Sequence, residues 1–204
     1  MKQKSDSASL TTNSPRSGCH GRKLATLAGI RNAVSLAHSL NSHQIEVTMY
    51  YTIYSSPLGP LAMAASGKGI TMADFQNGAR PLIIGKDWIR QTEPFIKATR
   101  LLDTYFAGQP VQFDLQYDLQ GTPFQQQVWK QLLGISPGET MSYGEFAASL
   151  GRPSAARAVG TAIGRNPVSL MIPCHRVIGT NGSLTGYAGG LLLKQQLLDI
   201  EKGL

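Results

Sequence analysis

The chain has few cysteines and no long apolar run. Only two of its 204 residues are cysteine, Cys19 and Cys174. Two cysteines exclude a disulfide framework and favour a reducing, cytoplasmic setting. No run approaches the roughly 20 apolar residues that a membrane-spanning helix needs, so no membrane association is expected. No second pair of metal ligands accompanies Cys19-His20, and a zinc site is therefore not expected there.

Acidic residues are missing from one long stretch. The chain carries 19 basic and 12 acidic side chains, a formal net charge of +7. Much of this excess belongs to residues 1–48, which hold six basic and two acidic side chains. From Phe146 to Leu198 no residue is acidic and five are basic: Arg152, Arg157, Arg165, Arg176 and Lys194. A DNA-facing site needs such a basic field, although a solvated face of a mildly basic protein would have the same composition.

The turn residues predict a short leading segment and two domains with an α+β fold. Residues 1–48 have a polar start and a weak helical pattern, so we expect a disordered extension, or a true start at Met49. Residues 49–118 should form a small antiparallel sheet domain with one helix. The strands are expected at 50–54, 61–65 and 70–75, and the helix at 95–106.

Residues 121–204 are predicted to form a mainly helical domain. Thr122-Pro123 indicates a helix start, with Thr as N-cap and Pro at the first helical position. A helix over 143–150, the turn Gly151-Arg152-Pro153 and a helix capped by Ser154 and ending near Ile163 make a helix-turn-helix pattern. The second helix of this pattern, which ends near Ile163, is rich in Ala and Gly. Such small residues suit either a helix backbone close to the wall of a DNA groove or tight packing between helices.

Cys174 stands in the run Met171-Ile172-Pro173-Cys174-His175-Arg176-Val177-Ile178-Gly179. A His and an Arg beside a thiol lower its pKa, and the thiolate is the reactive form of cysteine. These residues alone leave two interpretations open, a reactive cysteine and a small core residue.

The cysteine run is one of five motifs that follow one another along the chain. They are Ser142-Tyr143, Arg157-Ala158-Val159-Gly160, Asn166-Pro167, Pro173-Cys174-His175-Arg176 and Tyr187-Ala188-Gly189-Gly190. In this order they resemble the O6-alkylguanine-DNA alkyltransferase family, the methylated-DNA–protein-cysteine methyltransferases of DNA repair. The resemblance is dense from about Gly121 onward and looser from about Met49 to Asp118. It implies repair of O6-alkylguanine, and of O4-alkylthymine, by irreversible transfer of the alkyl group to Cys174.

The resemblance also implies catalytic roles. Glu201 would accept a hydrogen bond from His175, which would draw the thiol proton through a water. Tyr143 would assist extrusion of the base and donate a hydrogen bond to its ring, and Asn166 would tie the cysteine loop together. A thioether has no acyl carbon that water can attack, so each molecule should act once, without a metal or organic cofactor.

The contacts with DNA follow from the same resemblance. Arg157 would enter the duplex and fill the space of the flipped nucleotide. The carbonyls of Cys174 and Val177 would accept hydrogen bonds from the exocyclic amine of guanine, and the Ala188 amide would bind O6. The further residues expected at DNA or at the base are Tyr187, Arg165 and Lys194. The expected partner is double-stranded DNA containing O6-alkylguanine, bound by a monomer.

Three other functions fit part of the pattern. An alkyltransferase-like protein flips lesions without repairing them, but that class replaces the cysteine that is retained here as Cys174. A methyl-responsive transcription factor built on this module brings a Cys-rich zinc domain upstream, which is absent. A Cys-His hydrolase needs an oxyanion element, and none stands out. Within the alkyltransferase interpretation, Ser169 and Thr185 are expected to tune the preference between methyl and bulkier adducts.

Overall fold

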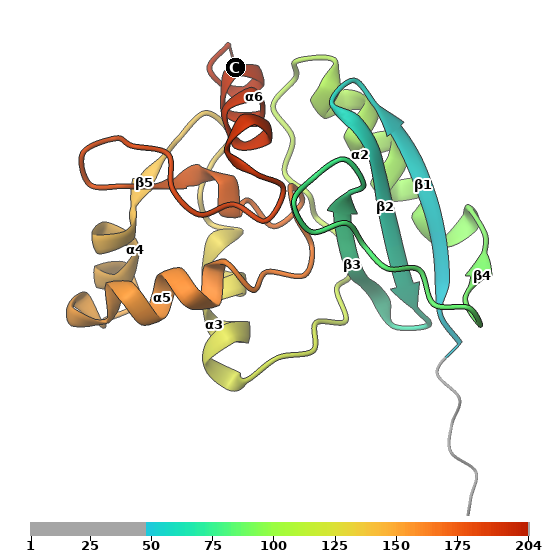
Figure 1. The fold of residues 1–204 in the computed structure, drawn as a ribbon, viewed down its shortest axis with the longest axis horizontal. Coiled ribbons are helices and arrows are strands. Elements are labelled where there is room, and N and C mark those ends of the chain that lie inside the picture. The colour runs from blue at the N-terminus through green and yellow to red at the C-terminus, as the bar shows by residue number, and fades with distance from the viewer. Residues whose placement is uncertain (1–47, 204) are drawn as a thin grey trace, which may run out of the picture. The chain divides into compact units, whose positions relative to one another are not determined.

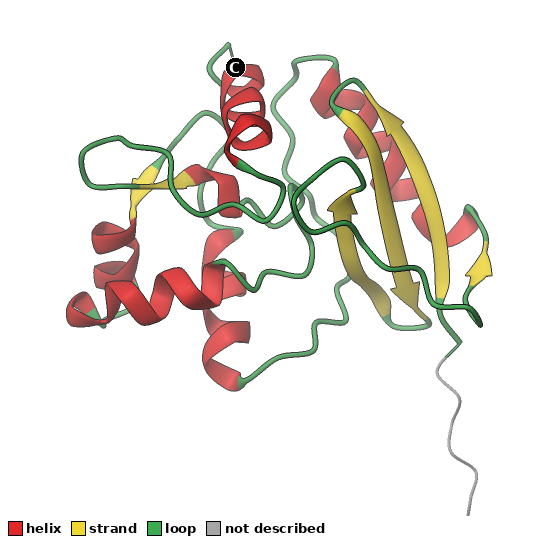
Figure 2. Cartoon of the chain, in the orientation of Figure 1, coloured by secondary structure: helices red, strands yellow, loops and turns green. Residues whose placement is uncertain are grey.

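The computed structural model describes residues 48–203, which form a sheet followed by a group of helices (Figures 1 and 2). The predicted extension over residues 1–48 lies outside the described residues except for Thr48, as do Cys19 and His20. No helix among the described residues is both long and apolar enough to cross a membrane.

The first half of the described chain is built on a four-stranded sheet. Its strands, in the spatial order β3-β2-β1-β4, are β1 (Tyr50–Ser56), β2 (Gly59–Ser66), β3 (Gly69–Phe75) and β4 (Ile89–Arg90). The predicted antiparallel meander of β1, β2 and β3 is confirmed. β4 is an addition that the sequence did not predict, and it runs parallel to β1. Consecutive residues Leu61 to Ala65 of β2 are almost fully buried, so both faces of the central strand are covered.

One helix accompanies this sheet, as predicted. A short 3-10 turn (Glu93–Phe95) leads into α2 (Ile96–Phe106), which lies against the sheet in Figure 1. Its buried residues are Ala98, Leu102 and Tyr105. Their spacing of three and four residues places them on one face of the helix.

The edge strand β3 is extended by a segment from the second half of the chain. Ala73 forms a parallel bridge with Val168, and its backbone N–H donates to the Pro167 carbonyl at 2.9 Å. The Ser169 N–H donates in turn to the Ala73 carbonyl at 2.8 Å. The stretch that leads to Cys174 is therefore attached to the edge of the sheet by a single bridge.

The second half is mainly helical, as predicted. Its helices are α3 (Pro123–Leu132), α4 (Tyr143–Ser149), α5 (Ala156–Ile163) and α6 (Leu191–Glu201). Thr122 caps α3 and forms a capping box with Gln125, which confirms the predicted start. Val128 and Leu132 are buried on the inner face of α3, together with Trp129.

The helix-turn-helix pattern is confirmed in α4 and α5, but its predicted cap is wrong. A 3-10 turn (Pro153–Ala155) precedes α5, and its N-cap is Arg152, with no side-chain capping bond. Ser154 lies inside this turn, because Pro153 already sets a helical φ one residue earlier. Ser154 is therefore past the position at which its hydroxyl could cap the helix.

The small residues of α5 serve close packing on its inner face. A Cβ at Gly160 would lie 3.5 Å from the ring of Tyr143, and the indole of Trp129 donates to the Ala162 carbonyl at 2.9 Å. On the opposite face Arg157, Ala158 and Thr161 are exposed. The two interpretations that the sequence left open for these small residues therefore belong to different faces of one helix.

Candidate active site

A two-stranded sheet places Tyr143 next to the cysteine turn. β5 (Met141–Ser142) pairs in parallel with β6 (Val177–Ile178), which directly follows the 3-10 turn Cys174–Arg176. Ser142 then caps α4 with a capping box, so Tyr143 begins the helix at this junction. The Tyr143 hydroxyl donates to the Thr185 carbonyl at 3.3 Å.

Asn166 is the centre of the cysteine loop. Its Nδ2 donates to the Ile172 carbonyl at 2.9 Å and to the Val168 carbonyl at 3.3 Å, and its Oδ1 accepts from the Val168 N–H at 3.0 Å. The same amide group also donates to Sγ of Cys174 at 3.1 Å. The first three contacts are the kind of support expected for Asn166. The fourth, which the sequence did not suggest, is a hydrogen bond that favours the thiolate.

The thiol itself is protonated in the free protein. Cys174 is 5% exposed, and this burial raises the pKa of its thiol to about 11, although the bond from Asn166 opposes the shift. The expectation that His175 and Arg176 would lower this pKa is wrong for the free protein. Loss of hydration outweighs the neighbouring groups, so ionisation of the thiol requires a proton acceptor close by.

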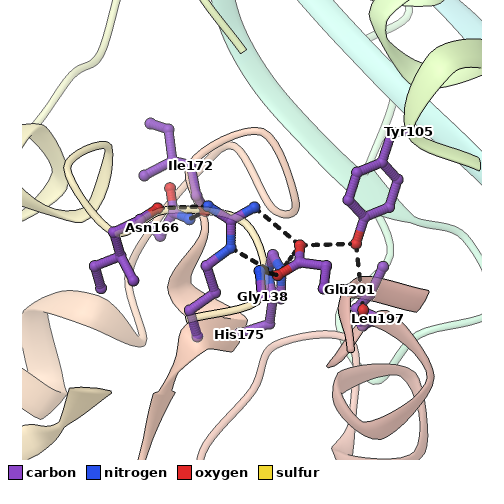
Figure 3. A network of polar contacts seen from close by, with 9 residues as sticks. Tyr105, Gly138, Asn166, Ile172, His175, Leu197 and Glu201 are labelled. Carbon is purple, nitrogen blue, oxygen red and sulfur yellow. Dashed lines mark hydrogen bonds and ion pairs between the residues drawn. The ribbon is translucent and has the colours of Figure 1, made fainter. Parts of the chain in front are cut away.

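His175 is suited to accept that proton. Its imidazole is fully buried, and Nε2 lies 2.9 Å from Oε1 of Glu201 (Figure 3). Burial lowers the pKa of His175, and the opposing effect of Glu201 is smaller, so the ring is neutral near pH 7. With its proton on Nε2, facing the carboxylate, the ring presents Nδ1 as an acceptor, and Nδ1 has no hydrogen-bond partner among the described residues.

Glu201 is held by more groups than the sequence indicated. Arg176 donates from Nε to Oε2 at 2.8 Å and from Nη2 to Oε1 at 2.9 Å, and the Tyr105 hydroxyl donates to Oε1 at 3.0 Å. Figure 3 shows these contacts converging on the carboxylate. Burial acts to raise the pKa of Glu201, but the bonds from His175 and Arg176 dominate and lower it to about 2. No local sequence signal connects Tyr105, on α2, to this site.

Two of the five residues in the predicted basic field do not face DNA. Arg176 is 4% exposed and neutralises Glu201. Lys194 is completely buried, and its Nζ donates to the carbonyls of Val177 at 2.6 Å and Thr185 at 2.7 Å. The prediction that Lys194 contacts DNA is therefore wrong. It ties the segment at Val177 to the segment at Thr185 instead.

The exposed part of the basic field is carried by arginines of the helix-turn-helix region. Arg152, Arg157 and Arg165 are exposed. Tyr187 is half-buried, and its ring meets the ring of His175 edge-on, with centroids 6.4 Å apart. Ala188 follows it and is also half-buried.

The backbone carbonyls expected to read the base already accept one hydrogen bond each. The Cys174 carbonyl accepts from the Val177 N–H, and the Val177 carbonyl accepts from Lys194. A carbonyl oxygen has two lone pairs, so each retains one for a further donor.

Because Lys194 is buried and Arg157 is exposed, replacing Lys194 should change mainly protein stability, whereas replacing Arg157 should change mainly DNA binding. Lys194→Met should lower the free energy of unfolding by about 1–3 kcal/mol, because the buried Val177 carbonyl loses its donor. The dependence of DNA affinity on salt should stay unchanged. Arg157→Ala should leave stability within about 0.5 kcal/mol and weaken DNA binding, because its side chain is exposed. Urea unfolding and DNA titrations at several salt concentrations measure both effects, and a reduced salt slope for Lys194→Met would contradict this assignment.

Known proteins resemble the chain over nearly all of its described residues. Residues 49–119 match the family model for the 6-O-methylguanine DNA methyltransferase ribonuclease-like domain, and residues 123–203 match the model for its DNA binding domain. The methylated-DNA–protein-cysteine methyltransferase of Methanosarcina acetivorans is 46% identical over 75% of this chain and 98% of its own length. That of Methanosarcina barkeri is 49% identical over 76% and 98%.

Solved structures agree with these relatives. The crystal structure of the Mycobacterium tuberculosis O6-methylguanine methyltransferase has a TM-score of 0.69 and 46% identity, over 76% of this chain and 93% of that one. The Mycobacterium tuberculosis protein in complex with DNA has the same score and identity, over 75% and 92%.

A helix-turn-helix next to a buried cysteine, with an imidazole–carboxylate pair behind it, defines a DNA-acting protein that works through a thiol. The chain belongs to the O6-alkylguanine-DNA alkyltransferase family, the methylated-DNA–protein-cysteine methyltransferases. Its activity is DNA repair by transfer of an alkyl group from DNA to a cysteine of the protein.

Proposed function

We propose that the chain reverses O6-alkylguanine in double-stranded DNA by a single, irreversible alkyl transfer to Cys174. The observation that carries this proposal is the position of Sγ, which receives a hydrogen bond from Asn166 while His175 and Glu201 form a relay in the same buried cluster. The other cysteine of the chain, Cys19, has no such motif around it.

The relay generates the nucleophile only when it is needed. The Cys174 proton passes to Nδ1 of His175 through a water, and Glu201 stabilises the resulting imidazolium through Nε2. Because the pKa of Glu201 is about 2, the carboxylate does not take the proton itself. The side-chain amide of Asn166, which donates to Sγ, stabilises the negative charge that develops on the sulfur.

The transfer itself balances without a cofactor. The thiolate attacks the alkyl carbon in line, an S–C bond forms, and the C–O6 bond breaks with its electrons on guanine O6. Guanine regains one proton at a ring nitrogen, so the net change exchanges an alkyl group for the thiol proton. The Tyr143 hydroxyl, at the start of α4, is the donor that would approach this ring and assist the leaving group.

Access to the alkyl carbon requires the nucleotide to leave the base stack. An adduct at O6 weakens pairing, which reduces the cost of extrusion. Arg157 is exposed on α5 and would occupy the vacated space, while Tyr187, Ala188 and the Val177 carbonyl would contact the extruded base. Arg165, exposed just after α5, would bind phosphate.

Three further properties are part of the proposal. O4-alkylthymine is a second substrate, because it carries the same alkyl–oxygen bond on a flipped base. The protein acts as a monomer in the cytoplasm. Its domains comprise residues 49–118 and 121–204, which agree within a few residues with the two family-model matches.

Mass spectrometry tests the central claim. After incubation with a duplex containing O6-methylguanine, the Cys174 peptide should gain one methyl group in place of hydrogen, and the Cys19 peptide should gain none. With excess DNA, the amount of repaired guanine should equal the amount of protein and then stop, because the thioether is not hydrolysed. Continued turnover, or methylation of another residue, would refute the proposal.

A further inference from the structure

Asp74 is a partly buried acid that the transfer mechanism does not use. It lies on β3, opposite Ala62 of β2, in the sheet domain. Its Oδ1 accepts a hydrogen bond of 2.8 Å from the hydroxyl of Ser169, whose side chain is completely buried. Ser169 is 95 positions away in the sequence and belongs to the segment that leads to Cys174.

This bond is made where the backbone leaves the sheet for the cysteine loop. The neighbouring Ala73 pairs with Val168, and the Ser169 N–H donates to the Ala73 carbonyl. The next residue, Leu170, has a φ of +71°, a left-handed conformation that is unfavourable for leucine. Ser169 is therefore fixed through both backbone and side chain just before a strained residue, which is held by its surroundings.

The same segment reaches the sulfur through Asn166. Asn166 binds Val168 with both ends of its amide group and donates to Sγ of Cys174. Asp74 and Asn166 also line one surface pocket, together with Arg80 and Arg165. The Asp74 carboxylate therefore shares a pocket with the residue that donates a hydrogen bond to the Cys174 sulfur.

The charges around the two groups show how the carboxylate acts on the sulfur. Burial raises the pKa of Asp74 to about 6, and the bond from Ser169 and the charge of Arg80 oppose that shift. At neutral pH Asp74 is consequently an anion. On the thiol, the Asp74 charge adds to burial in raising the pKa, while Asn166 and Lys194 act in the opposite direction. Tyr143 and Tyr187 also face Cys174, and both are neutral at this pH because burial raises their pKa. His175, which follows Cys174 in the chain, is neutral as well because burial lowers its pKa.

We propose that Asp74 is a positioning residue of the alkyl-transfer site, which anchors the cysteine loop through Ser169 and whose negative charge adds to the cost of ionising the buried Cys174 thiol. This role of Asp74 rests on the proposed function. A protein that acts once is lost if its thiolate reacts with a small electrophile before it meets a lesion. The Asp74 charge, acting together with burial, makes this thiolate harder to form in the absence of a bound base.

Asp74→Asn and Ser169→Ala separate the two parts of this role. Asn keeps an acceptor for Ser169 but removes the charge, whereas Ser169→Ala keeps the charge but removes the bond. The readout is the pH dependence of Cys174 alkylation by iodoacetamide in the absence of DNA, followed on the Cys174 peptide with the Cys19 peptide as internal reference. Asp74→Asn should shift the profile to lower pH by about half a unit to one unit, a gain of about three- to tenfold in rate below the midpoint. Ser169→Ala should leave the midpoint in place and slow single-turnover methyl transfer.

A matched charge removal serves as the control. Asp114→Asn removes a carboxylate whose side chain is 92% exposed, and it should not move the profile. If Asp74→Asn gives the wild-type profile, or if Asp114→Asn shifts it equally, the inference is overturned. Should Asn not be tolerated at position 74, Asp74→Ser removes the same charge and is judged by the same shift. Wild-type methyl transfer is measured in parallel: if it is absent, the proposed function fails, whereas the DNA-free alkylation still decides the role of Asp74.

Discussion

Alkyl transfer should stop completely when Cys174 is replaced by alanine. Cys174 is the proposed acceptor of the alkyl group, and no other described residue is a cysteine. Affinity for duplex DNA should stay within about twofold, because phosphate contacts dominate such binding and we propose that exposed arginines, not Cys174, make them. Repair of an O6-methylguanine duplex and a fluorescence-anisotropy titration of the same duplex measure the two properties.

Cys19→Ala is the matched control for this variant. It removes the other cysteine of the chain and should retain full stoichiometric transfer. Transfer by Cys174→Ala at the wild-type stoichiometry would show that another residue is the acceptor. Loss of transfer in both variants would show that the assay responds to something other than the site.

Glu201→Gln should reduce both stability and transfer rate. The carboxylate is 1% exposed and accepts hydrogen bonds from His175, Arg176 and Tyr105. Removing its charge leaves the Arg176 guanidinium buried without a counter-ion, which should cost about 3–5 kcal/mol of unfolding free energy. The imidazole also loses its orienting anion, so the rate of methyl transfer should fall by about 10²–10⁴-fold. Urea unfolding and single-turnover kinetics test these two effects.

The stability difference between wild type and Glu201→Gln should depend on pH in one direction. The folded-state pKa of Glu201, about 2, lies below the ordinary glutamate value of 4.5. The ionised carboxylate therefore contributes its full stabilisation above about pH 4.5, and this contribution is lost as the pH falls toward 2. The gap in unfolding free energy should be widest near neutral pH and should narrow in acid.

Glu139→Gln provides the control for the charge change. Glu139 is exposed and lies next to Gly138, whose backbone N–H is 3.4 Å from Oε2 of Glu201. This variant should stay within about 0.5 kcal/mol of wild type at every pH. A gap of the same size for both substitutions, or one that widens in acid, would contradict the assigned role of Glu201.

Much of the fold could be predicted because its signals are local. The turns between β1, β2 and β3 and the Thr122 cap of α3 involve residues only a few positions apart. β4 escaped prediction because it has two residues, too few for a period to be recognised. The cap at Ser154 was misplaced because Pro153 starts the turn one residue earlier. In both cases the error lies at a short element, where pattern gives least information.

The candidate site could be predicted as a set of residues but not as an electrostatic environment. Asn166, His175 and Glu201 lie where their motifs suggested, as neighbours of Cys174 or of one another. The direction of the thiol pKa was wrong, since burial cannot be deduced from the two residues that follow the cysteine. Lys194 was assigned to DNA for the same reason, because a lysine in a basic stretch gives no indication that its side chain points inward.

The order of residues along the chain was sufficient for the family and the fold class, and it predicts the nucleophile. Turn, cap and motif chemistry acts over a few positions, so it can be recognised without knowing the packing. Only the folded structure decided that Tyr105 supports Glu201 across 96 positions and that Asp74 anchors Ser169 across 95. These contacts, like the burial of Cys174 and Lys194, arise when distant segments share one interior, because the loss of water there sets both the pKa values and the hydrogen-bond partners.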